Sequence, residues 1–138
     1  MVSRQQVVTA ARQKLGAAFR HQARGPEAYD CVGLVIKVAH ELGLSDFDSK
    51  AYTRAPDPVE MREALEANLD YVRFCSVLPG DVLWFRAPEP QHLAIVTQVE
   101  PMQMVHAFAR VSRVVETGVD RFWRGRLVAC FRYRGLDG

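Results

Sequence analysis

Residues 29–42 read YDCVGLVIKVAHEL, and this stretch decides the fold. The run that follows Cys31 is apolar nearly all round, which predicts a helix buried on most of its sides. Asp30 precedes the run as a natural N-cap, and Gly43 can end the helix. Cys31 is therefore expected in the first turn, where the partial positive charge of unpaired backbone N–H groups stabilises a thiolate.

Two interpretations of Cys31 stay open at this point. A cysteine that opens an apolar helix is often only a small hydrophobic core residue. A polar loop with a Gly25-Pro26 turn leads directly into Cys31, however, and buried core cysteines seldom follow such loops. The loop therefore favours a reactive thiol.

Helices are predicted on both sides of this segment, and strands follow them. Ser3 can cap a helix that Gly16 ends, residues 19–29 form a polar loop, and Asp57-Pro58 opens a helix to about residue 69. Beyond it lie short β-rich runs and a helical turn at 119–124, the runs being 71–74, 81–86, 93–99, 102–108, 113–116 and 127–133. Helices followed by consecutive strands predict an α+β domain, with the N-terminal helices packed on a central antiparallel sheet of about five to six strands.

The length of 138 residues fits one domain, residues 1–138. Hydrophobic residues make up 49% of the chain and charged residues 25%, so it can bury an ordinary core and is not a disordered protein. No apolar run reaches the roughly 18 residues of a membrane helix, and the N-terminus lacks the apolar centre of a signal peptide. We therefore expect synthesis in the cytoplasm and no membrane partner.

The charge is unevenly spread although its net value is only +2. Residues 1–24 carry five basic and no acidic side chains, and residues 101–138 carry seven basic against three acidic. The C-terminal arginines alternate with strand-like apolar residues and match no nucleic-acid-binding motif. They are interpreted as a solvated face, and no nucleic-acid partner is expected.

The three cysteines are Cys31, Cys75 and Cys130, an odd number at wide spacing. This fits neither a disulfide framework nor a zinc site with a short chelating pair. Cys75 and Cys130 lie in strand patterns and are predicted to be core residues. No metal and no cofactor are expected, and Cys31 remains the candidate nucleophile.

Two histidines in strand-like runs, His92 and His106, are candidates for the base that a cysteine nucleophile requires. Their separation is even, so a hairpin turn of odd length near Glu100-Pro101 places both on one face of the sheet. Small neighbours beside His92 are expected to leave room for the N-terminus of the Cys31 helix. The alternative is a pair of structural histidines bonded to backbone.

Four ordered motifs resemble the NlpC-type cell-wall peptidases, a papain-like group of cysteine hydrolases. They are YDCVGLV at 29–35, PGDVLWF at 79–85, HLAIV at 92–96 and VHA at 105–107. The resemblance covers nearly the whole chain and implies a papain-like NlpC-type fold. It also implies a catalytic triad in which Cys31 is the nucleophile, His92 the base and His106 the residue that orients the base.

The resemblance further implies a cysteine peptidase that cleaves peptidoglycan stem peptides, typically between γ-D-glutamate and a diamino acid. Segment 19–22 and the compact length look most like the bacteriophage or prophage tail-associated branch, which implies phage tail proteins as partners and a place in the virion. Many members have serine where this chain has Val32, and tyrosine where it has Phe19. His21, Tyr29 and Asp30 are therefore candidates for substrate or oxyanion contacts.

Two other functions are kept as hypotheses. One retains the thiol chemistry on a different amide or ester, as an amidase or acyltransferase. The other is a structural tail-assembly subunit in which the fold persists without activity. Release of peptide fragments from peptidoglycan would separate the peptidase from both.

Overall fold

The computed structural model describes residues 1–88 and 90–137. Its helices are α1 (Arg4–Arg12), α2 (Cys31–Glu41), α3 (Pro58–Asn68) and α4 (Arg121–Arg124), with short 3₁₀ turns at Phe74–Ser76 and Ala109–Val111. Its main strands are β4 (Leu69–Val72), β5 (Val82–Phe85), β6 (His92–Val99), β7 (Met102–Phe108), β8 (Arg113–Gly118) and β9 (Leu127–Tyr133). Four two-residue strands complete it: β1 (Val2–Ser3), β2 (Ala18–Phe19), β3 (Ala28–Tyr29) and β10 (Leu136–Asp137).

The helices begin where their caps predict. The Ser3 hydroxyl accepts the Gln6 N–H in a capping box, and the Asp57 carboxylate accepts the Val59 N–H with Pro58 in the first turn. The first helix is shorter than predicted, because Gly16 has a φ of +87° and donates its N–H to the Val114 carbonyl. Residues 13–16 therefore form a turn that delivers the chain to the sheet.

Eight strands form one sheet in the order β3-β2-β8-β7-β6-β5-β9-β4. All pairs are antiparallel except β2 with β3. This confirms the predicted α+β class but exceeds the predicted five to six strands. The two additional strands, β2 and β3, lie at the ends of the stretch predicted as a loop, because two-residue strands show no alternation that a sequence pattern can reveal.

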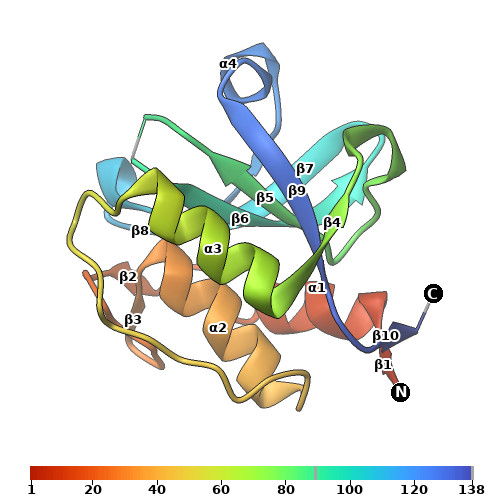
Figure 1. Ribbon diagram of the computed structural model, residues 1–138, viewed down its shortest axis with the longest axis horizontal. Coiled ribbons are helices and arrows are strands. Elements are labelled where there is room, and N and C mark those ends of the chain that lie inside the picture. The colour runs from red at the N-terminus through yellow and green to blue at the C-terminus, as the bar shows by residue number, and fades with distance from the viewer. Residues whose placement is uncertain (89, 138) are drawn as a thin grey trace.

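Both faces of the sheet are covered (Figure 1). Helices α1, α2 and α3 lie on one face, where Leu34 and Val38 of α2 pack with Ile95 of β6. On the opposite face Ala94 of β6 packs in a second cluster with Trp123 of α4. Successive residues of β6 thus alternate between two cores, as the period of a strand requires. No helix among residues 1–88 and 90–137 is long and apolar enough to cross a membrane.

The three cysteines lie in different environments, and none is paired with another. Cys130 of β9 is buried in the second cluster, which confirms its prediction. Cys75 is exposed in the 3₁₀ turn after β4, so its prediction as a core residue was wrong. The turn interrupts the strand pattern there and leaves the side chain exposed. The exposure of Cys31 is intermediate between that of Cys75 and that of Cys130.

Candidate active site

Cys31 is the first residue of α2, as predicted. The Asp30 side chain caps the helix, its Oδ1 accepting the Gly33 N–H at 2.7 Å. Gly33 has to lack a side chain, because a Cβ there would lie 2.0 Å from the Ala23 carbonyl oxygen. The loop of residues 20–24 therefore lies directly against the first turn of the helix that carries the thiol.

Asp30 is buried, and its carboxylate is engaged by protein donors. Its Oδ2 accepts the Gln22 N–H at 2.8 Å and the Tyr52 hydroxyl at 2.7 Å. The Arg24 guanidinium lies 3.3 Å from Oδ1 and supplies the opposite charge. These donors occupy both oxygens, so Asp30 positions the 20–24 loop and the helix. Asp30 also lines the pocket that contains Cys31, and its contact with a substrate stays a prediction.

A one-residue bulge places His92 and His106 on the same face of the sheet. The hairpin pairs Val99 with Met102, so its turn has two residues and not the odd number predicted. A two-residue turn alone would put the histidines on opposite faces. The register shifts at Thr97, which restores the shared face. The Thr97 side chain is buried and donates to Glu116 at 2.7 Å.

The two histidines form a buried hydrogen-bonded pair. His92 Nε2 lies 2.8 Å from His106 Nδ1, and His106 Nε2 lies 2.9 Å from the Thr117 hydroxyl. Aromatic rings enclose the pair, and the His92 ring stacks on Trp123 with centroids 5.5 Å apart. Burial and the neighbouring His106 hold the pKa of His92 well below its usual range, and burial lowers the pKa of His106 to about 4. Both rings are neutral at neutral pH.

One of the two sets of tautomers that satisfy these contacts allows His92 to act as a base. A base must present an unprotonated nitrogen, and Nε2 of His92 is occupied by His106. If His92 accepts a proton on Nδ1, its Nε2–H donates to His106 Nδ1. His106 then carries its proton on Nε2 and donates it to the Thr117 oxygen. In this set the Thr117 hydroxyl accepts from His106 Nε2, which leaves His106 Nδ1 to accept from His92.

The Cys31 sulfur abuts the beginning of β6. Sγ lies 3.8 Å from the carbonyl oxygen of Gln91, and the N–H of Leu93 also reaches the sulfur. These two backbone groups flank His92, and Cys31 and His92 line the same pocket. No hydrogen bond joins the thiol to the imidazole within residues 1–88 and 90–137. The structure thus brings nucleophile and base to one pocket while a backbone carbonyl accepts the thiol proton.

The protonation state of Cys31 differs from the sequence expectation. Burial, followed by the charge of Asp30, raises the pKa of the thiol to about 12. The backbone N–H groups of Cys31, Val32 and Leu93 act in the opposite direction but do not outweigh these two causes. The expectation that the helix N-terminus lowers this pKa was wrong for the resting site, because the sequence pattern did not reveal how deeply the sulfur is enclosed.

The helix also approaches the sheet on a different side from that predicted. The small neighbours of His92, Ala94 and Val96, pack in the second cluster with the rings of α4. Helix α2 covers the opposite face and contacts Leu93 and Ile95. Cys31 therefore reaches His92 around the end of β6, where the chain turns at Gln91.

The pocket around Cys31 is a hollow of about 400 Å³ that combines polar and apolar side chains. Its walls come from four chain segments, and the lining side chains include Phe19, His21, Cys31, Val32, Tyr52, Arg54, Gln91 and His92. His21 lies at this wall, with its ring edge-on to Tyr52 and the two ring centroids 5.5 Å apart, and its predicted contact with a substrate stays a prediction. Tyr29 does not line the pocket. It is 3% exposed and packs in the first core, so it supports the site from beneath.

The sequence patterns did not identify Tyr52, Gln91, Thr117 or Trp123 as part of the site. Tyr52 lies in the irregular segment 44–57, which we call the strap. Thr117 lies beyond the predicted end of its strand. Gln91 has a φ of +56°, and its side chain accepts the Trp84 indole N–H at 2.8 Å. That bond holds the Gln91 carbonyl beside Cys31. No local sequence motif predicts a bond between Trp84 and Gln91.

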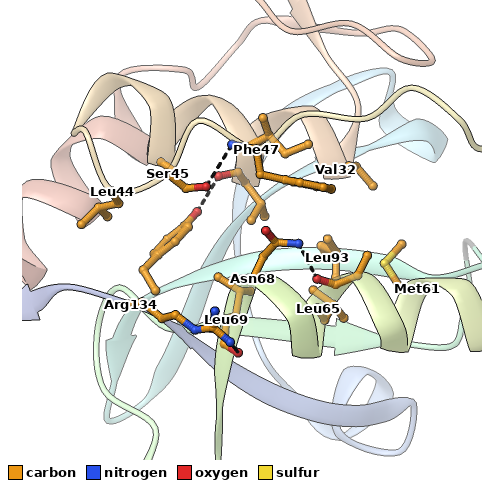
Figure 2. Close-up of a pocket in the computed structure, with 15 residues that line it drawn as sticks. Val32, Leu44, Ser45, Phe47, Met61, Leu65, Asn68, Leu69, Leu93 and Arg134 are labelled. Carbon is orange, nitrogen blue, oxygen red and sulfur yellow. Dashed lines mark hydrogen bonds between the residues drawn. The ribbon is translucent and has the colours of Figure 1, made fainter.

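A second hollow, of about 600 Å³, lies beside the first, between α2 and α3 (Figure 2). Its walls are apolar and come from both helices, the strap and β6, including Val35, Leu44, Phe47, Met61, Leu65 and Leu93. Val32 lines both hollows. The polar groups at its wall are bonded within the protein, since Asn68 donates to the Ala64 carbonyl and the Tyr133 hydroxyl to the Val35 carbonyl.

No protein-family model matches this sequence, and no curated protein matches it either. Solved structures do match. The NlpC/p60 domain of the peptidoglycan hydrolase SagA superposes with a TM-score of 0.70 at 19% identity, covering 94% of this chain and 98% of that one. The chain has the NlpC/P60 fold.

Two further structures share the NlpC/P60 fold. NlpC1 from Trichomonas vaginalis matches with a TM-score of 0.69 and 21% identity over 92% of this chain and 42% of that one. The peptidoglycan hydrolase RipB from Mycobacterium tuberculosis matches with a TM-score of 0.64 and 17% identity over 94% and 64%. The chain therefore spans less than half the length of the Trichomonas protein. These matches confirm the papain-like NlpC-type fold that the sequence motifs predicted.

Proposed function

We propose that this chain is a cysteine peptidase that cleaves amide bonds in the stem peptides of peptidoglycan. The observation that carries the proposal is the meeting, in one pocket, of the Cys31 thiol at a helix N-terminus with the hydrogen-bonded pair His92 and His106. The solved structures with this fold include proteins described as peptidoglycan hydrolases. Fold and site together favour this reaction class over a purely structural role.

The reaction begins with attack of Cys31 Sγ on the amide carbonyl carbon. His92 takes the thiol proton on Nδ1 as the C–S bond forms, and the imidazolium then protonates the leaving amine as the C–N bond breaks. Water hydrolyses the resulting thioester with His92 acting again as base. The Cys31 backbone N–H, at the positive end of α2, is the donor for the oxyanion.

Proton transfer accompanies attack and does not precede it in this mechanism. At neutral pH the thiol is protonated and His92 is neutral, because burial disfavours both charged forms. Substrate binding has to displace the Gln91 carbonyl as the partner of the thiol. His106 and Thr117 hold the tautomer of His92 that accepts the proton.

The finer parts of the proposal rest on the motif resemblance. We propose that the scissile bond joins γ-D-glutamate to a diamino acid. We also propose a phage or prophage tail protein, made in the cytoplasm and brought to the wall by tail partners, because segment 19–22 resembles that branch. Digestion of purified sacculi, with mass spectrometry of the released fragments, identifies the bond. Co-purification with tail proteins tests the second point.

The central experiment compares wild type with Cys31→Ala on peptidoglycan and on synthetic stem peptides. Wild type is expected to release fragments with new amino termini, and the variant none. If folded and reduced wild type releases no fragment, the peptidase proposal fails. A tail-assembly role would then be the better account.

One observation favours a second candidate, a thiol acyltransferase or amidase acting on a more apolar substrate. The second hollow is apolar and shares Val32 with the pocket of Cys31, so an aliphatic group next to a scissile carbonyl has a place to bind. Hydrolysis of nitrophenyl esters of increasing chain length tests this function. A rate that rises with chain length while stem peptides stay intact would favour it.

A further inference from the structure

His92 has to carry a positive charge for part of the reaction, between taking the thiol proton and giving it to the leaving group. The ring is only 1% exposed, so burial makes that charge costly. Its partner His106 is neutral and bonds in turn to the Thr117 hydroxyl. In the part of the chain that the structure describes, no acidic side chain bonds to either ring. Another group therefore has to stabilise the imidazolium.

The acids on the elements that pack against His92 are engaged elsewhere. Asp30 lines the same pocket, but protein donors occupy both of its oxygens and Arg24 supplies the opposite charge. Asp120 caps α4 by accepting the Trp123 N–H at 3.3 Å. The basic groups on these elements, which disfavour a second positive charge, are His21 and Arg54 at the pocket and the exposed Arg121 and Arg124 on α4.

Three aromatic rings surround the His92 imidazole, and we call them the aromatic cage. The ring centroid of Trp123 lies 5.5 Å from that of His92 with the planes 26° apart. The centroid of Phe108 lies 5.6 Å away, and that of Phe85 6.3 Å away. The face of an aromatic ring is electron-rich and attracts a cation within about 6 Å of the centroid. The cage thus offers the buried ring an attraction that exists only while the ring is charged.

Trp123 lies at the centre of the cage because of how α4 is built. This helix has four residues, and Trp123 is the buried one, at 6% exposure, whereas its neighbours Phe122 and Arg124 are exposed. The indole also contacts Phe85 at 5.0 Å and Phe108 at 5.4 Å between centroids. Helix α4 therefore presents one large side chain to the sheet, directly against His92.

We propose that the aromatic cage stabilises the imidazolium that His92 forms during the reaction, with Trp123 as the positioning residue that contributes most. The inference rests on the proposed function and specifies what takes the place of a carboxylate beside the base. As the bond from Cys31 Sγ to the carbonyl carbon forms, the S–H bond breaks and the proton moves to His92 Nδ1. The cage attracts the charged ring more than the neutral one, so it lowers the barrier and leaves substrate binding unchanged.

The experiment weakens the indole face without changing its shape. Tryptophan analogues with an increasing number of ring fluorine atoms are placed at position 123 alone, in a Cys75→Ala background. The single-turnover acylation of Cys31 by nitrophenyl acetate then measures the attack step without a stem peptide. The rate constant is expected to fall stepwise along the series, by about tenfold in total, toward the unassisted rate that His92→Gln defines. On stem peptides the same series should lower kcat and leave KM nearly unchanged.

Two controls separate this effect from packing and from an acid. Trp123→Leu should lose at least as much rate as the most fluorinated analogue. The matched Phe131→Leu change removes a buried ring from the first core and should keep the acylation rate within about twofold. Glu89 lies outside the described residues, and Glu89→Gln should likewise keep the rate. Thermal unfolding of each protein confirms that it is folded.

The outcomes distinguish this inference from the proposed function. An acylation rate that stays constant along the fluorinated series would overturn the role of the cage. So would a wild-type rate equal to that of His92→Gln, or a Glu89→Gln rate that falls to the same level, since a carboxylate would then stabilise the imidazolium. If fluorination slows acylation although wild type leaves stem peptides intact, the peptidase proposal fails and the role of the cage stands.

Discussion

Two hollows lie on either side of Val32, and they differ in the chemical groups that line them. The larger one, between α2 and α3, has apolar walls whose polar groups are bonded within the protein. The smaller one contains a thiol, an imidazole and an arginine. Val32 follows Cys31 directly, so one helical turn faces both. The comparison teaches that reactive groups converging from several segments distinguish a candidate active site better than size or enclosure does.

The largest expected effect is the loss of Cys31. Cys31→Ala should lower kcat/KM on stem peptides at least about a thousandfold, because no other group in the pocket can form the covalent intermediate. Cys75→Ala is the matched control, since this exposed thiol lies outside both hollows. If Cys31→Ala still hydrolyses stem peptides, the reaction does not require the thiol. The pocket of Cys31 would then be no better a candidate active site than the apolar hollow.

Removal of a wall from the apolar hollow should affect stability and not chemistry. Leu65→Ala leaves a void beside Met61 and should lower the free energy of unfolding by about 3 kcal/mol. Urea unfolding measures that loss. The kcat/KM of the remaining folded enzyme should stay within about twofold of wild type, since no reacting group is touched. A large fall in kcat/KM would place the substrate in this hollow and support the acyltransferase candidate.

Acid should destabilise the protein through the buried histidine pair. The pKa of His106 is lowered to about 4 in the folded state, whereas unfolded histidine titrates near 6.5. The unfolded chain therefore binds the extra proton first, so stability is full above about pH 6.5 and is lost as pH falls toward 4. His106 alone accounts for about 3 kcal/mol, and His92 acts in the same direction. Denaturant unfolding across this range, with His106→Gln showing a shallower slope, provides the measurement.

Alkylation should show that the resting thiol is protonated. With its pKa raised to about 12, Cys31 should react with iodoacetamide at neutral pH at least about thirtyfold more slowly than a free thiol. Its rate should still be rising above pH 9. Exposed Cys75 serves as the internal comparison in the same digest, read by mass spectrometry. Rapid labelling of Cys31 with an inflection below pH 8 would instead show a thiolate paired with an imidazolium.

The smallest effect is expected from Thr117. Thr117→Val removes the hydroxyl that accepts from His106 and should lower kcat about tenfold with KM nearly unchanged. Thr117→Ser should restore most of the rate, because it keeps the oxygen. Nitrogen chemical shifts of His106 should report a mixed tautomer in the valine variant only. A rate loss shared equally by both variants would indicate a packing effect.

The sequence predicted most of the framework and less of the electrostatics. The start of α2 at Cys31 and the bounds of β7 followed from a cap and from alternation, which are local properties. The sequence correctly predicted that His92 and His106 share a face, but it derived this from a turn of odd length. The turn has two residues, and the single bulged residue Thr97 restores the shared face. The pKa of Cys31 is raised first by burial of the sulfur at the start of β6, where it meets Gln91, a residue 60 positions away in the chain and therefore outside any local window of sequence.

The bulge at Thr97 is a position where the hairpin can lose a residue without separating the histidines. If Thr97 is deleted and the hairpin turn is kept, Val96 still pairs with Met104, so His92 and His106 stay on the same face of the sheet. A deletion of one residue among 93–96 would instead turn His92 to the opposite face and dismantle the pair without altering either histidine. An inactive copy of such a gene would still carry Cys31 and both histidines. Two copies that each lack one codon between the two motifs can therefore differ in whether the pair survives, and the position of the loss decides it.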